Sequence, residues 1–162
     1  MRYQINQKIF SFGDNFTIKD EYGSEKFFVK GKIFAFGDKL RIYDENGIEK
    51  VYIEQKLFKF MPEYSIYLEG QYAAKVKKEF TFFRPRFYIE STFGQYSIEG
   101  DFFGYDFRIL KQGRIVASVS KKFFSFRDSY GVDIADDENQ VLILALVIVI
   151  DQVIHDENHN NN

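Results

Sequence analysis

A segment that is repeated along the chain decides the fold. Residues 8–18 read KIFSFGDNFTI, and residues 32–42, which begin 24 positions later, read KIFAFGDKLRI. Each copy holds a Phe-x-Phe pair, a short turn and a second apolar segment. Four further copies, one of them shortened, begin at Lys56, Lys78, Phe103 and Lys122. The sequence therefore consists of six related units, and the spacing of such units governs the choice of fold.

A second set of markers follows the same spacing. These are the glycines that end short polar clusters: Gly23, Gly47, Gly70, Gly94 and Gly113. Asn46-Gly47 is a tight-hairpin signal, because both residue types tolerate positive φ. Each unit thus has two turns and two strands. Apolar and polar residues alternate between the turns, and the connections are too short for crossover helices, which predicts an antiparallel meander.

The turns delimit about twelve strands. We expect each Phe-x-Phe pair to end one strand, and an aromatic or aliphatic residue to begin the next. Most Phe side chains are then expected in the core of the domain. The predicted strands cover residues 3–12, 15–20, 25–36, 39–44, 49–60, 64–69, 72–82, 86–92, 95–103, 106–111, 114–126 and 129–134.

The C-terminal segment departs from this pattern. Val141–Ile154 is almost wholly apolar, and residues 136–139 before it are polar and mostly acidic, as at a helix start. The β-branched content also permits a strand, but the length favours a helix over about 138–154, with residues 155–162 as a polar tail. A helix that is apolar all round needs burial all round, and a long meander needs its edges removed. We therefore predict a mainly β domain over residues 1–154, in which a closed antiparallel barrel of about twelve strands encloses the helix.

This architecture resembles the LURP-one-related family, in its short, bacterial-type form. That family is similar in fold to the tubby C-terminal domain and the phospholipid scramblases. The resemblance rests on the apolar segment Val141–Ile154 and on the Phe-x-Phe pairs. The pairs are Phe10/Phe12, Phe34/Phe36, Phe58/Phe60, Phe80/Phe82 and Phe124/Phe126. The resemblance implies that the helix fills the barrel. It also implies that the acidic cluster Asp133–Asn139 lies where scramblase-like relatives have a proposed calcium segment, but helix capping and solubility are the preferred reading of this cluster, and calcium binding is the alternative.

Composition excludes several classes of chemistry. The chain has 20 Phe and 11 Tyr among 162 residues, but no Cys, so disulfides, thiolate metal sites and cysteine nucleophiles are impossible. Its two His, His155 and His159, lie in the expected tail, which gives little support to a metal site or a catalytic triad. No nucleotide-binding glycine motif occurs. We expect no catalytic residues, no cofactor and no metal.

Charge is unevenly distributed along the chain. The net charge is −2, yet residues 71–131 carry 11 basic and 6 acidic side chains, whereas residues 132–162 carry 7 acidic side chains and no Lys or Arg. The densest basic stretch supplies the candidate site for an anion or a lipid headgroup. Its residues are Lys75, Lys77, Lys78, Arg84 and Arg86. Tubby relatives bind phosphoinositide headgroups through surface basic residues, which supports this reading by analogy; the alternative is that these side chains only solvate the outer strand faces.

We therefore expect a non-enzymatic binding or scaffold protein, associated with an anionic phospholipid surface or a protein partner. No apolar signal core precedes the first unit, and no apolar run reaches membrane-spanning length, so we expect a cytoplasmic protein without a transmembrane segment. Nucleic acid is not an expected partner. The alternatives are a small-molecule binder or an enzyme with a cleft at a barrel end, and a protein–protein interaction module.

Overall fold

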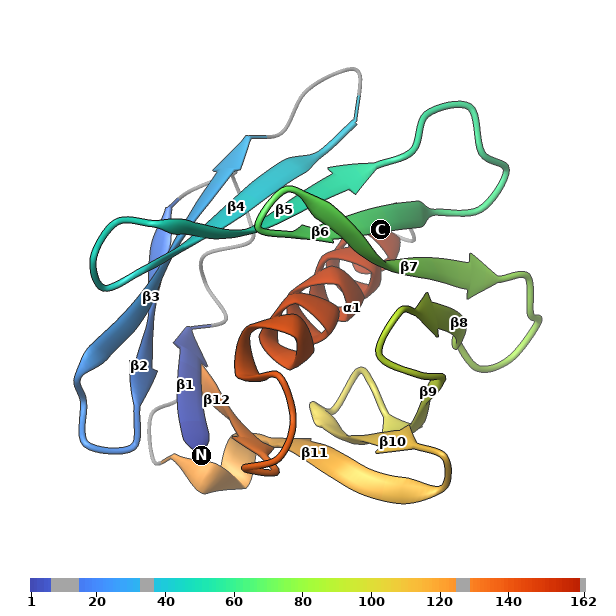
Figure 1. The fold of residues 1–162 in the computed structure, drawn as a ribbon. Helices are drawn as coiled ribbons and strands as arrows, with labels where there is room; N and C mark the ends of the chain where they lie inside the picture. Colours follow the sequence, from blue (N-terminus) through green and yellow to red (C-terminus); the bar gives the residue numbers. More distant parts are fainter. Residues whose placement is uncertain (7–14, 33–36, 125–128, 161–162) are drawn as a thin grey trace.

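The computed structural model describes residues 1–6, 15–32, 37–124 and 129–160. These residues form twelve antiparallel strands and one α-helix, and the strands close into a barrel around the helix (Figure 1). The strands are β1 (Arg2–Asn6), β2 (Phe16–Asp20), β3 (Glu25–Lys32), β4 (Lys39–Asp44), β5 (Glu49–Gln55), β6 (Glu63–Leu68), β7 (Gln71–Glu79), β8 (Arg86–Ser91), β9 (Tyr96–Asp101), β10 (Asp106–Lys111), β11 (Arg114–Ser120) and β12 (Ser129–Ile134). The predicted fold class is confirmed.

The barrel closes between the first and the last strand. β1 pairs with β12 in a register that runs from Arg2 opposite Asp133 to Asn6 opposite Ser129. Every other strand pairs with its neighbours in sequence, so the ring is a meander without an open edge. Closure satisfies the backbone groups that an open sheet of this length would leave unpaired.

The helix α1 (Gln140–Asn160) occupies the interior. Asn139 caps it, because the Asn139 side-chain oxygen accepts a hydrogen bond from the Leu142 amide at 3.0 Å. Every residue from Leu142 to Ile150 is 0 % exposed, which agrees with a helix that is apolar on all sides. Among the described residues, no helix combines the length and the apolarity needed to cross a membrane.

The helix continues past its predicted end. We expected a polar tail from residue 155, but residues 155–160 are helical, and His155, Asp156 and Glu157 are half-buried. The carboxylate of Glu157 forms an ion pair with Lys78 on β7. This contact with the barrel wall stabilises the extra turn, although the sequence of the turn is polar.

The Phe-x-Phe pairs are where the sequence-based expectation was wrong. β5, β7 and β11 end at Gln55, Glu79 and Ser120, before the pairs that were predicted to end them. Phe58, Phe60, Phe80 and Phe82 are exposed and do not contribute to the core. The pairs Phe10/Phe12 and Phe34/Phe36, and Phe126, lie outside the described residues.

The second half of that expectation is confirmed. The residue at or near the start of the following strand is buried in each of five units, where it faces the helix side of the barrel. These residues are Phe16, Leu40, Tyr64, Phe107 and Tyr130. The alternation of inward and outward side chains holds only while the backbone is paired and extended. Beyond the end of a strand it no longer predicts burial.

One end of the barrel matters for the site, and we call it the helix-exit end. The helix begins at the opposite end, beside the glycine turns, and its last turns lie where β5, β7 and β9 end. The ion pair between Lys78 and Glu157 and the hydrogen bond between Tyr105 and Asp151 both join α1 to this end. The loops β5–β6, β7–β8 and β9–β10 surround it.

Candidate functional site

The five basic residues of the candidate site do not form one free patch. Lys75 and Lys77 lie on the outer face of β7, whereas Lys78 lies on the other face, as strand alternation predicts. The Lys75 ammonium pairs with the Glu90 carboxylate of β8 at 3.5 Å. Lys78 pairs with Glu157, and only 13 % of its side chain is exposed. Both lysines therefore have structural partners.

The other three cations are exposed and carry no ion pair with any described residue. They are Lys77 on β7, Arg84 in the β7–β8 loop and Arg86 at the start of β8. Arg86 lies opposite Glu79 in the β7–β8 ladder, but the two side chains do not form an ion pair. These three side chains keep their positive charge available to an external anion.

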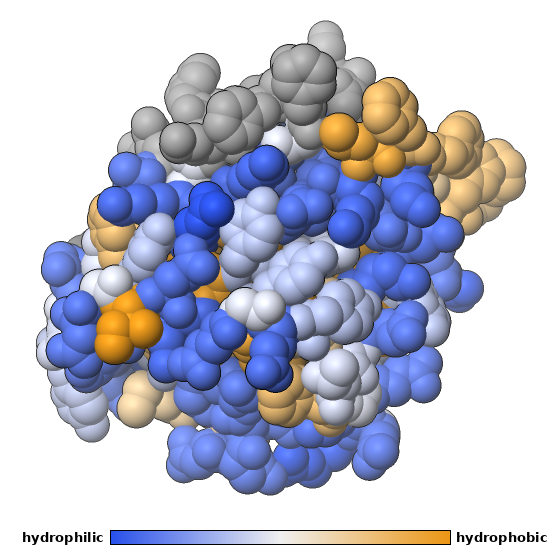
Figure 2. Space-filling view, turned by 45° about the horizontal axis from the view of Figure 1, so that its top comes forward, coloured by the Kyte–Doolittle hydropathy of each residue, from blue (hydrophilic) through white to orange (hydrophobic). Residues whose placement is uncertain are grey.

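Aromatic side chains stand beside these cations. We call residues 56–62 and 80–85, which connect β5 to β6 and β7 to β8, the aromatic loops. Their exposed fractions are 103 % for Phe58, 88 % for Phe60, 61 % for Phe80, 85 % for Phe82 and 97 % for Phe83. Figure 2 shows hydrophobic side chains that project at the upper right of the molecule, beyond its mostly hydrophilic body. Exposed apolar groups in this density mark an interaction surface.

The two aromatic loops contact each other. The ring centroids of Phe60 and Phe80 lie 6.1 Å apart, and Phe80 meets Phe82 edge-on at 5.2 Å. Both distances fall within the range of favourable aromatic pairs. The loops thus form one surface feature, which neither could make alone.

A cleft lies next to this feature. It has a volume of about 480 Å³ and lies between the β7–β8 and β9–β10 loops. Phe83, Arg84 and Phe103 contribute exposed side chains, and Asp101 contributes a carboxylate that accepts a hydrogen bond from the Gly104 amide at 3.0 Å. The cleft therefore combines the Arg84 cation and the Asp101 carboxylate with apolar walls at the helix-exit end.

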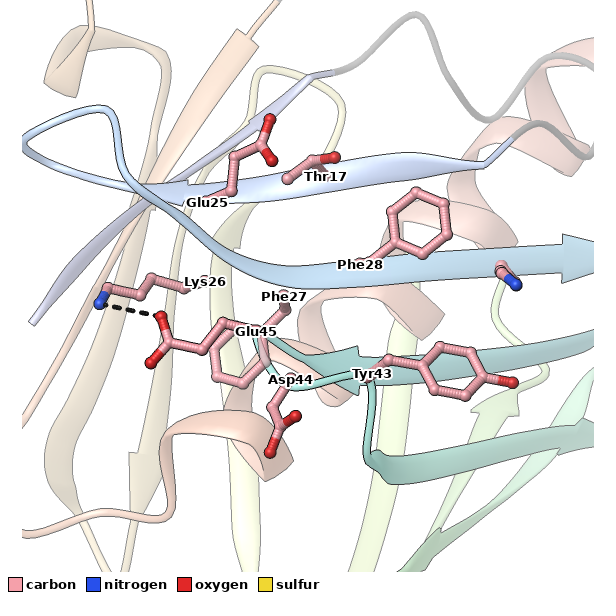
Figure 3. A pocket seen from close by; sticks show the side chains of 10 residues that line it. Thr17, Glu25, Lys26, Phe27, Phe28, Tyr43, Asp44 and Glu45 are labelled. Carbon is pink, nitrogen blue, oxygen red and sulfur yellow. Dashed lines mark hydrogen bonds and ion pairs between the residues drawn. The ribbon is translucent and has the colours of Figure 1, made fainter.

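A second depression lies on the outer face of β2, β3 and β4, with a volume of about 430 Å³ (Figure 3). The Lys30 ammonium lies over the rings of Phe28 and Tyr43, at 5.6 and 5.4 Å from their centroids. At its edge, Lys26 pairs with Glu45 at 3.5 Å. Both of its lysines thus already contact neighbours within the chain, which makes this depression a weaker candidate for an anion site than the helix-exit end.

Comparison with known proteins identifies the family. A family model described as LURP-one-related matches residues 1–151. The chain belongs to the LURP-one-related family. The Bacillus subtilis (strain 168) protein YxjI, described as uncharacterized, is 37 % identical over 153 residues, which cover 94 % of this chain and 93 % of that protein. A solved crystal structure of an Arabidopsis thaliana protein superposes with a TM-score of 0.67 over 94 % of this chain and 91 % of that one; at 17 % identity it shows the shared fold.

In this LURP-one-related chain, the acidic cluster Asp133–Asn139 is occupied by contacts within the protein. Asp133 pairs with Arg2 at 3.4 Å, and Asp136 with the terminal amino group at 3.0 Å. Asp137 pairs with Arg114 at 2.9 Å. Glu138 is 8 % exposed and accepts a hydrogen bond from the Tyr96 hydroxyl at 3.0 Å. The cluster therefore closes the barrel end where the helix begins, and the described residues contain no group of three or more His, Asp or Glu side chains suited to a metal ion.

Sequence reasoning missed one buried polar centre of this family member. Asp151 is 3 % exposed, and its carboxylate accepts hydrogen bonds from the hydroxyls of Tyr105 at 2.5 Å and Tyr130 at 3.0 Å. Burial raises the pKa of Asp151 to about 6, while the two hydrogen bonds act in the opposite direction. The available signal was a lone acidic residue within an otherwise apolar run. Asp151 lies enclosed within the barrel, so its hydrogen bonds join parts of the interior and it is not part of the outer surface.

Proposed function

We propose that this LURP-one-related protein is a non-enzymatic binding protein that associates peripherally with anionic phospholipid surfaces. The observation that carries the proposal is the group of three exposed cations, Lys77, Arg84 and Arg86, which have no carboxylate partner among the described residues. They lie next to the exposed aromatic loops at the helix-exit end. Anionic headgroups would supply the negative partner that these three cations lack among the described residues.

The expected strength is modest and depends on salt. A basic residue near an anionic membrane contributes about 1 kcal/mol, so three of them contribute about 3 kcal/mol, or roughly a hundredfold in partitioning. Lys75 and Lys78 contribute less, because each already neutralises a carboxylate of the chain. Screening shortens the range of these interactions as salt rises, so binding is expected to weaken between low and physiological ionic strength.

The cleft beside Arg84 supports a second candidate function, the binding of a small soluble anion at the barrel end. Its volume of about 480 Å³ lies within the range of small-molecule sites. A soluble headgroup such as glycerol phosphate then binds without any membrane. Isothermal titration with glycerol phosphate separates this candidate from surface association.

Vesicle flotation tests the main proposal. The protein is mixed with vesicles of phosphatidylcholine alone, or of phosphatidylcholine with phosphatidylserine, and binding is expected only to the second. The triple variant Lys77→Gln/Arg84→Gln/Arg86→Gln is expected to lose most of this binding. The matched control Lys26→Gln/Lys50→Gln/Lys75→Gln removes the same charge from lysines that already pair with Glu45, Glu69 and Glu90.

The control variant is expected to bind the anionic vesicles much as the natural protein does. Equal loss in both triple variants would mean that net charge alone governs binding. Absence of binding to anionic vesicles at low salt would refute the proposal.

A further inference from the structure

We propose that the aromatic loops insert their Phe side chains into the interfacial region of an anionic bilayer. This inference rests on the proposed function and gives it a specific contact. Phe58, Phe60, Phe82 and Phe83 are each at least 85 % exposed. Contiguous exposed apolar side chains mark protein or membrane interaction sites.

The backbone at Phe58 supports a role outside the fold. Its φ is +58°, in the left-handed region that bulky side chains rarely adopt. Phe58 is also 103 % exposed, so no packing against the described residues compensates for this conformation. Conformational strain of this kind gathers at functional positions. Here it directs an apolar ring fully into the solvent.

The shape of the surface suits a bilayer. The loops project outward as tips, and contacts from Phe60 to Phe80 and from Phe80 to Phe82 join them into one unit. Aromatic rings are favoured at the boundary between headgroups and acyl chains. Several projecting tips can enter this boundary together.

Charge identifies the occupant as an anionic bilayer. The aromatic loops contain no Asp or Glu, but they contain Lys56, Lys59 and Arg84, and Arg86 follows directly. Two of these cations form ion pairs with glutamates outside the loops. Lys56 pairs with Glu54 at 3.5 Å, and Lys59 pairs with Glu63, the first residue of β6, at 3.9 Å. A second copy of this chain would bring identical cationic loops together in a symmetric contact, which like charges oppose. An anionic bilayer provides an apolar environment for the rings and negative charge for the cations.

The absence of Trp from the natural chain provides a clean probe. In the variant Phe58→Trp, the single indole reports the polarity around the loop tip. We expect its emission to shift to the blue when phosphatidylcholine–phosphatidylserine vesicles are added, and to be quenched by lipids brominated on their acyl chains. The matched control Tyr22→Trp places the indole in the β2–β3 turn at the opposite end of the barrel, where Tyr22 is 86 % exposed. Its emission is expected to stay unchanged.

A second measurement tests the energetic contribution. The variant Phe60→Ser/Phe82→Ser is expected to bind anionic vesicles at least about tenfold more weakly, because it removes two apolar rings from the contact. The control Phe93→Ser changes an exposed Phe outside the aromatic loops, and it is expected to bind like the natural protein. Circular dichroism establishes that each variant retains the β fold.

The outcomes separate this inference from the proposed function. Flotation of Phe58→Trp with anionic vesicles, without a blue shift or quenching, leaves headgroup association standing and overturns insertion. Absence of flotation overturns both. A blue shift that grows with protein concentration in the absence of vesicles assigns the surface to a second copy, and it also overturns insertion.

Discussion

The hydroxyl of Tyr105 donates a hydrogen bond of 2.5 Å to the carboxylate of Asp151, and so joins the β9–β10 loop to the enclosed helix. Tyr130 of β12 donates to the same carboxylate at 3.0 Å. This centre connects the helix with two parts of the wall that are distant in sequence. An ionisable group in so enclosed a position makes stability depend on pH.

The first prediction concerns that pH dependence. Burial raises the pKa of Asp151 from 3.8 to about 6, so the folded chain holds this proton more tightly than the unfolded chain does. The contribution of Asp151 is therefore most favourable at low pH and is lost as pH rises from about 4 to about 6. A difference of about two pKa units corresponds to about 3 kcal/mol. The pKa of Asp38 is also raised to about 6, mainly by burial, and acts in the same direction.

Urea unfolding at pH 5 and pH 7.5 measures this effect. We expect greater stability at pH 5 than at pH 7.5. We expect Asp151→Asn to remove about half of the difference, because the amide does not titrate whereas Asp38 still does. An undiminished difference in Asp151→Asn would assign the pH dependence to other groups.

The second prediction concerns the enclosed helix. Leu144 is 0 % exposed, and Leu144→Asp would place a carboxylate among apolar side chains without a partner. Burial of an unpaired charge costs several kcal/mol, which is comparable to the whole stability of a domain. We expect this variant to be unfolded or insoluble by circular dichroism and sedimentation. The control Leu57→Asp, at a residue 45 % exposed, is expected to remain folded; a soluble, native β spectrum for Leu144→Asp would contradict the prediction.

The third prediction concerns the ion pair that holds the end of the helix. Only 13 % of the Lys78 side chain and 25 % of the Glu157 side chain are exposed. Glu157→Gln leaves the Lys78 ammonium partly buried without its partner, and it is expected to cost about 1–2 kcal/mol. Hydrogen exchange of residues 153–157 is expected to accelerate. Glu90→Gln removes the partner of the more exposed Lys75 and is expected to change stability by less than about 0.5 kcal/mol; equal effects of the two variants would count against a structural role for Glu157.

The fourth prediction concerns a glycine at a close approach of two strands. Gly100 has φ +127°, and a Cβ there would lie 2.6 Å from the Asp106 carbonyl oxygen. Gly100→Ala is therefore expected to destabilise the fold by about 3 kcal/mol, from both backbone strain and the clash. Gly113 also has positive φ, +81°, but it has no atom within 4 Å of such a Cβ. Gly113→Ala is expected to cost about 1 kcal/mol. Thermal denaturation of the Gly100→Ala and Gly113→Ala variants gives the contribution of the clash as the difference between their losses of stability. Equal losses would show that only backbone strain matters.

The fifth prediction is that a substitution at Phe58 changes stability and membrane binding in opposite directions. Phe58→Asn places a residue tolerant of the left-handed region at φ +58° and removes an exposed ring. We expect the free energy of unfolding to rise by about 0.5–1 kcal/mol, while vesicle binding falls. Chemical denaturation and flotation on the same preparation measure both quantities. A loss of stability in Phe58→Asn would show that the ring supports the fold.

Much of the fold could be predicted from local pattern. Alternation with a period of two, glycines at regular spacing and one long apolar run predicted the meander, its closure and the enclosed helix. The even-numbered strands agree with their predicted bounds to within about a residue, because a glycine turn or a buried aromatic residue marks their ends. The ends of β5 and β7 could not be predicted, because the Phe-x-Phe pairs continue the alternation beyond the last paired residue.

The residues of the candidate site could be predicted from the sequence less well than the fold, because their availability depends on tertiary contacts. The sequence by itself determined that basic side chains are concentrated in residues 71–131 and that the chain is a barrel around its own helix. Only the tertiary structure decided that Lys75 and Lys78 are neutralised, that Lys77, Arg84 and Arg86 are not, and that Phe58 and Phe60 are exposed. The physical reason is that periodicity records which side of a strand a residue faces. The pairing of Lys78 depends instead on Glu157, 79 positions away in the chain, and that proximity exists only once the barrel has closed around the helix.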